Sequence, residues 1–109
     1  MKVSELIKEL NLDLLTDSGF EDRDVNGCYI GDLLSHVMGK ATEGDAWITI
    51  MNNINIVAVA SLTEAACIIL AEGISADESI IKKADGEGIV IVKSDLTAFE
   101  LAVKISELL

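Results

Sequence analysis

Two stretches of this sequence are apolar at consecutive positions, and they constrain the fold more than any other feature. The first is ACIILAEG, residues 66–73, and the second is IVIVKS, residues 89–94. A strand with one face in water alternates apolar and polar residues, so an uninterrupted apolar run indicates a strand that is covered on both faces. Strands of this kind belong to parallel or mixed sheets between layers of helices.

The rest of the chain alternates shorter strand patterns with helical ones. Strands are also predicted over residues 12–16, 25–31 and 46–51, and helices over 4–10, 32–39, 52–65, 75–86 and 95–109. The segment 52–65 contains β-branched residues, but Ile56, Val59 and Ala60 fall at helical spacing, which favours a helix. We therefore predict one α/β domain over residues 1–109, with a small parallel or mixed β-sheet flanked by helices.

Each predicted helix begins near a side chain that is able to cap it. Such residues accept a hydrogen bond from a free backbone N–H group of the first helical turn. The predicted caps are Ser4, Asp32, the Asn cluster that begins at Asn52, Ser75 (in a capping box with Glu78) and Asp95.

The chain is strongly acidic. It carries 19 Asp and Glu against 8 Lys and Arg, a net charge of −11 at pH 7. This charge repels phosphate backbones and anionic lipid headgroups, so we expect no nucleic-acid partner and no membrane surface. The longest apolar runs are shorter than the roughly 20 residues of a membrane span, and the first residues lack a signal-peptide h-region. We therefore expect a cytoplasmic protein.

Few residues are suited to metal or redox chemistry. Cys28 and Cys67 are far apart and lie in apolar, strand-like contexts, which predicts two buried free thiols. Two cysteines and the single histidine, His36, are too few for a four-ligand zinc or iron–sulfur site. Acidic pairs elsewhere are typical of turns and helix starts. We expect neither a metal nor another cofactor.

Four stretches, taken in order, resemble one known family. They are GCYIGDLLSHVMGKA (27–41), AWITI (46–50), NIVAVASLTEAACIILAEG (55–73) and GIVIVKSDLTAFELA (88–102). This ordered set resembles the DRTGG domain family from about Val25 to the end of the chain. The most specific parts are the Gly-Asp-Leu-Leu-Ser core and the Asn-Ile-Val-Ala-Val-Ala run.

The resemblance implies a fold similar to the N-terminal domain of the HPr kinase/phosphorylase, and a regulatory or dimerising role. Such domains occur beside CBS domains in regulatory regions of some pyrophosphatases, and in some phosphate acetyltransferases. The resemblance assigns no catalytic residue. A kinase of the related type needs a phosphate-binding GxxxxGK[ST] loop, and the eight glycines of this chain never form one. We therefore expect that the chain is not an enzyme.

Asp32, Ser35 and His36 form the first candidate site. Residues three or four apart share a helix face, so Asp32 is able to meet Ser35 or His36, whereas Ser35 and His36 diverge. Catalysis needs a nucleophile, a base and an orienting acid in contact. The plainer interpretation is a helix cap, with Asp32 accepting from the Ser35 backbone N–H. Asp32 and Ser35 stand as candidate ligand-binding residues.

Polar residues also follow two of the predicted strands. Ligands in open α/β sheets bind at the carboxyl ends of strands, where amides are suited to a base or sugar and a helix start to a phosphate. Turn and cap chemistry explains the same residues equally well, and a carboxylate would oppose an anion. These candidate ligand-binding residues are Asn52, Asn53, Asn55, Ser94 and Asp95.

Trp47, the only tryptophan, is the candidate interface residue. Strand alternation places Trp47 on the face opposite Ile48 and Ile50. If the two isoleucines face the core, Trp47 is exposed and able to anchor a partner. The alternative is that Trp47 packs in the core.

Two functions are compatible with these features. The first is a non-enzymatic regulatory or protein-interaction module, homodimeric or paired with a larger enzyme or signalling protein. The alternative is a sensor for a small molecule, an adenine nucleotide, by analogy with CBS-associated regulatory domains. Four lysines would then supply the counter-charges: Lys40, Lys82, Lys83 and Lys93.

Overall fold

A computed structural model describes residues 1–109 and contains one five-stranded sheet. The strand order is β1-β5-β4-β3-β2. Strands β2, β3, β4 and β5 are parallel to one another, and β1 pairs with β5 in the antiparallel direction. The strands are β1 (Asp13–Leu14), β2 (Gly27–Ile30), β3 (Asp45–Thr49), β4 (Cys67–Leu70) and β5 (Ile91–Lys93). The predicted mixed α/β sheet is therefore confirmed.

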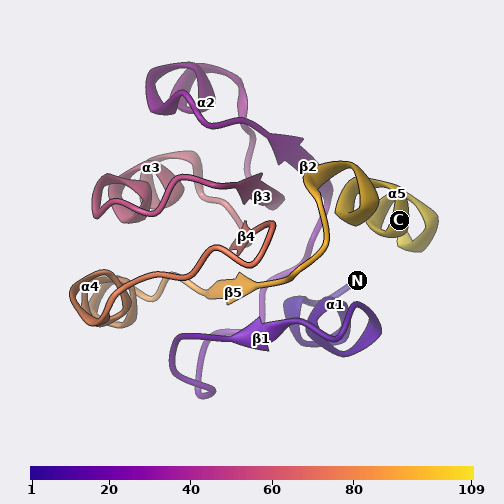
Figure 1. Cartoon of the computed structure of the whole chain (residues 1–109), viewed down its shortest axis with the longest axis horizontal. Helices are drawn as coiled ribbons and strands as arrows, with labels where there is room; N and C mark the ends of the chain where they lie inside the picture. Colours follow the sequence, from indigo (N-terminus) through magenta and orange to yellow (C-terminus); the bar gives the residue numbers. More distant parts are fainter.

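Helices cover both faces of this sheet. Each of the three parallel crossovers moves to the next strand in the same direction, which places their connecting helices in one layer. In Figure 1 this layer holds α2 (Leu34–Lys40), α3 (Asn55–Thr63) and α4 (Glu78–Glu87). The opposite layer holds α1 (Val3–Glu9) and α5 (Ala98–Leu108), the first and last helices of the chain.

Two hydrophobic cores lie on the two sides of the sheet. Ile48 and Ile69 belong to the core under α1 and α5, whereas Trp47 and Ile68 belong to the core under α2, α3 and α4. All four side chains are fully buried. The apolar runs are uninterrupted because successive side chains enter different cores.

The helix starts differ from the predicted ones. Thr97, and not Asp95, caps α5, because the Thr97 hydroxyl accepts from Glu100 N and Glu100 completes a capping box. Asp77 caps α4 by accepting from Ile80 N, so the predicted Ser75 box is wrong. In both segments several cap-competent side chains follow one another, and the path of the chain from the sheet selects among them.

Ser4 and Asp32 are not caps either. Ser4 lies inside α1, where its hydroxyl donates to Asp22 Oδ2 at 2.5 Å. Helix α2 begins after Leu33, which makes no side-chain cap hydrogen bond. The Ser4 and Asp32 side chains instead bind groups that are distant in the sequence.

Candidate functional site

The carboxyl edge of the parallel strands collects most of the predicted site residues. Asp32 follows β2, the Asn52–Asn53 pair follows β3, and the Ser94–Asp95 pair follows β5. Parallel strands end at one edge, so the fold brings these segments together as α/β sheets generally do.

Asp32 joins the ends of β2 and β3. Its Oδ1 atom accepts hydrogen bonds from Thr49 Oγ1 at 2.9 Å and from the Ile50 backbone N–H at 3.0 Å. Ser35 and His36 are exposed on α2, and no hydrogen bond joins either side chain to Asp32. The carboxylate therefore fixes the sheet edge and does not orient a nucleophile.

The asparagines tie down the loop that follows β3. Asn52 Nδ2 donates to the Ser75 carbonyl at 3.0 Å, which connects this loop to the one after β4. Asn53 Oδ1 accepts from the Asn55 backbone N–H at 2.9 Å, in a turn that leads into α3. The Asn55 side chain and the amide NH₂ of Asn53 make no hydrogen bond within the protein.

The loop after β5 is held in a similar way. Ser94 Oγ accepts from the Leu96 backbone N–H at 3.1 Å. The exposed Asp95 carboxylate lies over Gly73 of the neighbouring loop, where a Cβ atom would stand 3.1 Å from Asp95 Oδ1. Gly73 also has a φ of +73°, which suits glycine in this close approach.

Two cavities lie at the opposite, amino edge of the sheet. The first has a volume of about 560 Å³, and its walls come from the segments that enter β2, β3, β4 and β5. The lining is almost entirely polar, and half of its 12 residues are acidic: Lys2, Glu21, Asp22, Arg23, Asp24, Asn26, Glu43, Gly44, Ser61, Glu64, Glu87 and Ile89. A second cavity of about 160 Å³ shares Glu21 and Ile89 with it.

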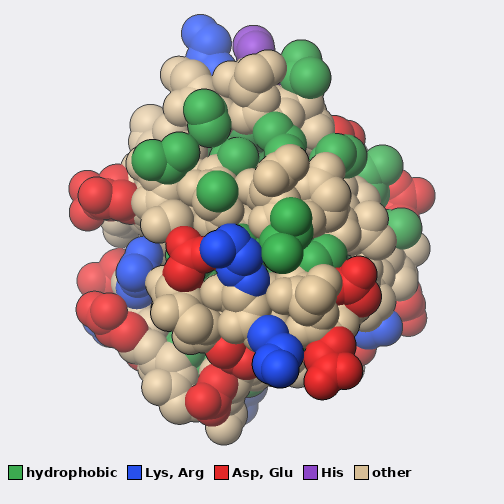
Figure 2. Space-filling view, turned by 90° about the vertical axis from the view of Figure 1, so that its left-hand side faces the viewer, with side chains coloured by type: hydrophobic (Ala, Val, Ile, Leu, Met, Phe, Trp, Pro, Cys, Tyr) green, Lys and Arg blue, Asp and Glu red, His purple; other side chains and the backbone are tan.

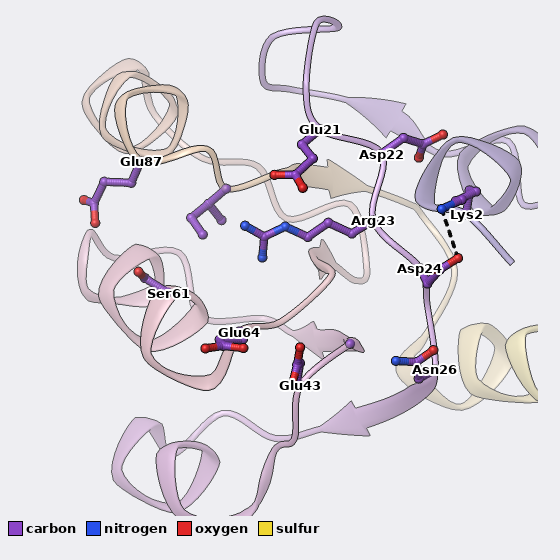
Figure 3. Close-up of a pocket in the computed structure, with 12 residues that line it drawn as sticks. Lys2, Glu21, Asp22, Arg23, Asp24, Asn26, Glu43, Ser61, Glu64 and Glu87 are labelled. Carbon is purple, nitrogen blue, oxygen red and sulfur yellow. Dashed lines mark ion pairs between the residues drawn. The ribbon is translucent and has the colours of Figure 1, made fainter.

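Arg23 extends into the larger cavity, surrounded by glutamates, as Figure 3 shows. Its Nη1 atom donates to the Ala65 carbonyl at 3.4 Å, and no carboxylate forms an ion pair with it. Lys2, the other cation of the lining, pairs with Asp24 at 3.2 Å. The cavity thus has a surplus of carboxylates, which favours cationic groups over phosphates.

The Asp22 carboxylate stabilises the outer wall of this cavity. It accepts hydrogen bonds from the hydroxyl and the backbone N–H of Ser4, which lower the pKa of Asp22, the hydroxyl most. Residues 17–24, which contain Asp22, lie between two predicted strands and were not among the predicted site residues. The available signal was Arg23, the single arginine of the chain, placed between acidic residues in EDRD.

Trp47 is fully buried, so the expectation that it anchors a partner is wrong. Its indole Nε1 donates to the Gly31 carbonyl at 2.9 Å, inside the core under α2, α3 and α4. The predicted alternation with Ile48 is correct. The Trp47 and Ile48 side chains point to opposite faces of β3, and both are buried because helices cover both faces of the sheet.

The two free thiols lie on the same side of the sheet, in strands that flank β3. Cys67 is buried as predicted, whereas Cys28 is only half-buried. Burial raises the pKa of Cys67 to about 12, and burial followed by the nearby Asp45 charge raises that of Cys28 to about 11. Neither thiol is ionised at neutral pH, so neither is an activated nucleophile.

No three His, Cys, Asp or Glu side chains converge in a metal-binding arrangement. None of the helices is both long enough and apolar enough to span a membrane.

The chain matches the family model of the DRTGG domain over residues 5–108. It is also similar to a crystal structure of the CBS and DRTGG domains of the regulatory region of Clostridium perfringens pyrophosphatase, complexed with the activator diadenosine tetraphosphate. The TM-score is 0.69 at 14% sequence identity, over 94% of this chain and 45% of that one. The chain therefore spans less than half of that region. No curated protein is significantly similar in sequence.

Proposed function

Because the chain belongs to the DRTGG domain family, we propose that it is a regulatory domain that responds to an adenine nucleotide. The observation that carries this proposal is the fold shared with a regulatory region that binds diadenosine tetraphosphate as an activator. The family match covers nearly the whole chain, residues 5–108.

The carboxyl edge of the sheet is the better place for a nucleotide. The cavity at the amino edge is lined by many carboxylates that would repel a polyphosphate. At the carboxyl edge, the exposed Asn53 and Asn55 side-chain amides are able to form hydrogen bonds with a nucleotide base. Lys93, at the end of β5, supplies a positive charge for a phosphate group. The net charge of −11 implies that the remaining phosphate charge is neutralised by a bound divalent cation or by a partner domain.

Thermal unfolding of the purified chain tests this proposal. Diadenosine tetraphosphate, ATP and AMP, each with Mg²⁺, are compared with GTP. A ligand at about 100 times its dissociation constant adds about 2.7 kcal/mol of stability. For a domain of this size that corresponds to a rise of roughly 10 °C in Tm. The proposal fails if no adenine nucleotide raises Tm, or if GTP raises it equally.

A matched pair of variants locates the nucleotide. Lys93→Glu should weaken binding about tenfold or more, since a charged hydrogen bond contributes about 1.5–3 kcal/mol. Lys104→Glu changes the net charge equally but lies on α5, and should leave the affinity unchanged. Equal losses in both variants would show that only the overall charge matters, and not the carboxyl edge.

The exposure of large apolar side chains favours a second candidate, a non-enzymatic interaction module that forms a homodimer. Leu62 on α3 is 72% exposed, and Leu33 before α2 is 68% exposed. Light scattering should then give twice the 11.6 kDa mass of one chain. Incubation with ATP and a phosphocarrier protein should yield no phosphoserine, because the chain has no phosphate-binding GxxxxGK[ST] loop.

A further inference from the structure

An apolar surface lies on the outside of the helical layer formed by α2 and α3. We call it the α2–α3 face and define it by the exposed residues Leu33, Met38, Ile54, Ala58 and Leu62. Figure 2 shows hydrophobic side chains gathered over the upper part of this side of the molecule, with charged side chains below them. Exposed apolar clusters of this kind mark interaction surfaces.

The α2–α3 face contains no acidic residue, although the chain has 19 of them. Neither residues 33–42 nor residues 50–63 contain an Asp or a Glu. The only ionisable side chains on these stretches are His36 and Lys40, both on α2. Carboxylates occur just beyond the ends of the stretches, at Asp32, Glu43 and Glu64. The face is thus neutral to basic and has an acidic rim.

Other apolar surface is interrupted by carboxylates. Phe99 and Val103 on α5 are 76% and 40% exposed, but the same helix carries two carboxylates, Glu100 and Glu107, against one lysine, Lys104. Two copies that met through α5 would therefore bring an excess of negative charge together, in molecules that already repel each other at −11. Two copies that meet through the α2–α3 face avoid this repulsion.

From this distribution of charge and exposure, we propose that the α2–α3 face is the docking surface for a second copy of this chain. The interface is isologous, so α2 and α3 of each copy form a layer of four helices between the two sheets. Leu62 and Leu33, the most exposed of its side chains, are its central contacts. This inference rests on the proposed homodimeric module and adds the location of its interface.

Sedimentation equilibrium of the full chain and two matched variants tests the inference. Leu62→Glu places a carboxylate in the apolar interface of both copies, and should raise the dimer dissociation constant by about 100-fold or more. Phe99→Glu makes the same charge change at an equally exposed residue on the opposite side of the sheet, and should leave the constant within about threefold. Met38→Glu tests the face from α2.

The outcomes distinguish an error in the location of the interface from an error in the proposed homodimer. Circular dichroism should match the wild type for every variant, because each mutated side chain is exposed. A variant that loses the dimer should also lose the part of Tm that depends on protein concentration. A wild-type chain that stays monomeric overturns both the homodimeric module and its interface. A dimer that survives Leu62→Glu and Met38→Glu, or that is lost only with Phe99→Glu, overturns the α2–α3 face and leaves the homodimer standing.

Discussion

Replacement of Trp47 tests the central feature of the fold, the sheet that is buried on both faces. The Trp47 side chain has no exposed area, and its indole N–H donates to the Gly31 carbonyl at 2.9 Å. Trp47→Ala removes the largest fully buried side chain of the chain and leaves the Gly31 carbonyl without this partner. Trp47→Phe keeps most of the aromatic packing and removes the hydrogen bond.

The expected losses follow from these contacts. Truncation of a buried aromatic residue to alanine costs about 3–5 kcal/mol. The half-buried Gly31 carbonyl adds about 1 kcal/mol, the lower end of the range for an unsatisfied group. Trp47→Ala should therefore lower the free energy of unfolding by about 4–6 kcal/mol, a large part of the total stability of an ordinary domain. Trp47→Phe should lower it by about 1–3 kcal/mol.

Urea unfolding followed by far-ultraviolet circular dichroism measures both losses. Tryptophan fluorescence is unsuitable because Trp47 is the only tryptophan. Phe99→Ala is the control, since Phe99 is 76% exposed and its loss should change the free energy of unfolding by no more than about 0.5 kcal/mol. The structural argument is refuted if Trp47→Ala is as mild as Phe99→Ala, because a side chain without that cost does not lie in a packed core.

Three further predictions concern single residues. Gly44→Ala should destabilise the domain by about 2 kcal/mol or more, measured by urea unfolding, because Gly44 has a φ of +84° and a Cβ there would clash with the Asn26 side chain. The matched Gly86→Ala, in open space on α4, should stabilise it by about 0.5–1 kcal/mol. The lowered pKa of Asp22 means that its contribution to stability is present above pH 3.8, its ordinary value, and is lost as the pH falls through the folded value. Acid titration by NMR should show this low pKa, and Ser4→Ala should return it toward 3.8; an unchanged pKa would contradict the hydrogen bonds. The half-buried Cys28, with a pKa of about 11, should react with a thiol reagent at pH 7 far more slowly than free cysteine, and reaction at the rate of a free thiol would contradict the raised pKa.

The order and type of the elements could be predicted from local patterns. The run at 66–73 and the run at 89–94 contain β4 and β5, and the ambiguous segment 52–65 contains helix α3. These predictions succeed because a strand buried on both faces and a helix with one buried face each produce a pattern of apolar residues that is recognisable over a short stretch of sequence. Strand β1 was also expected, but it has only two residues, since it pairs with a single short neighbour at the edge of the sheet.

The roles of individual side chains could not be predicted in the same way. The sequence by itself determined a two-sided α/β sheet, an acidic surface and a family resemblance, because these depend on composition and on neighbouring residues. Only the tertiary structure decided that Trp47 is buried, that Asp32 binds Thr49, and that Arg23 enters an acidic cavity. Each of these depends on a partner or a covering helix from another part of the chain, and local preference carries no information about which distant group the fold brings near.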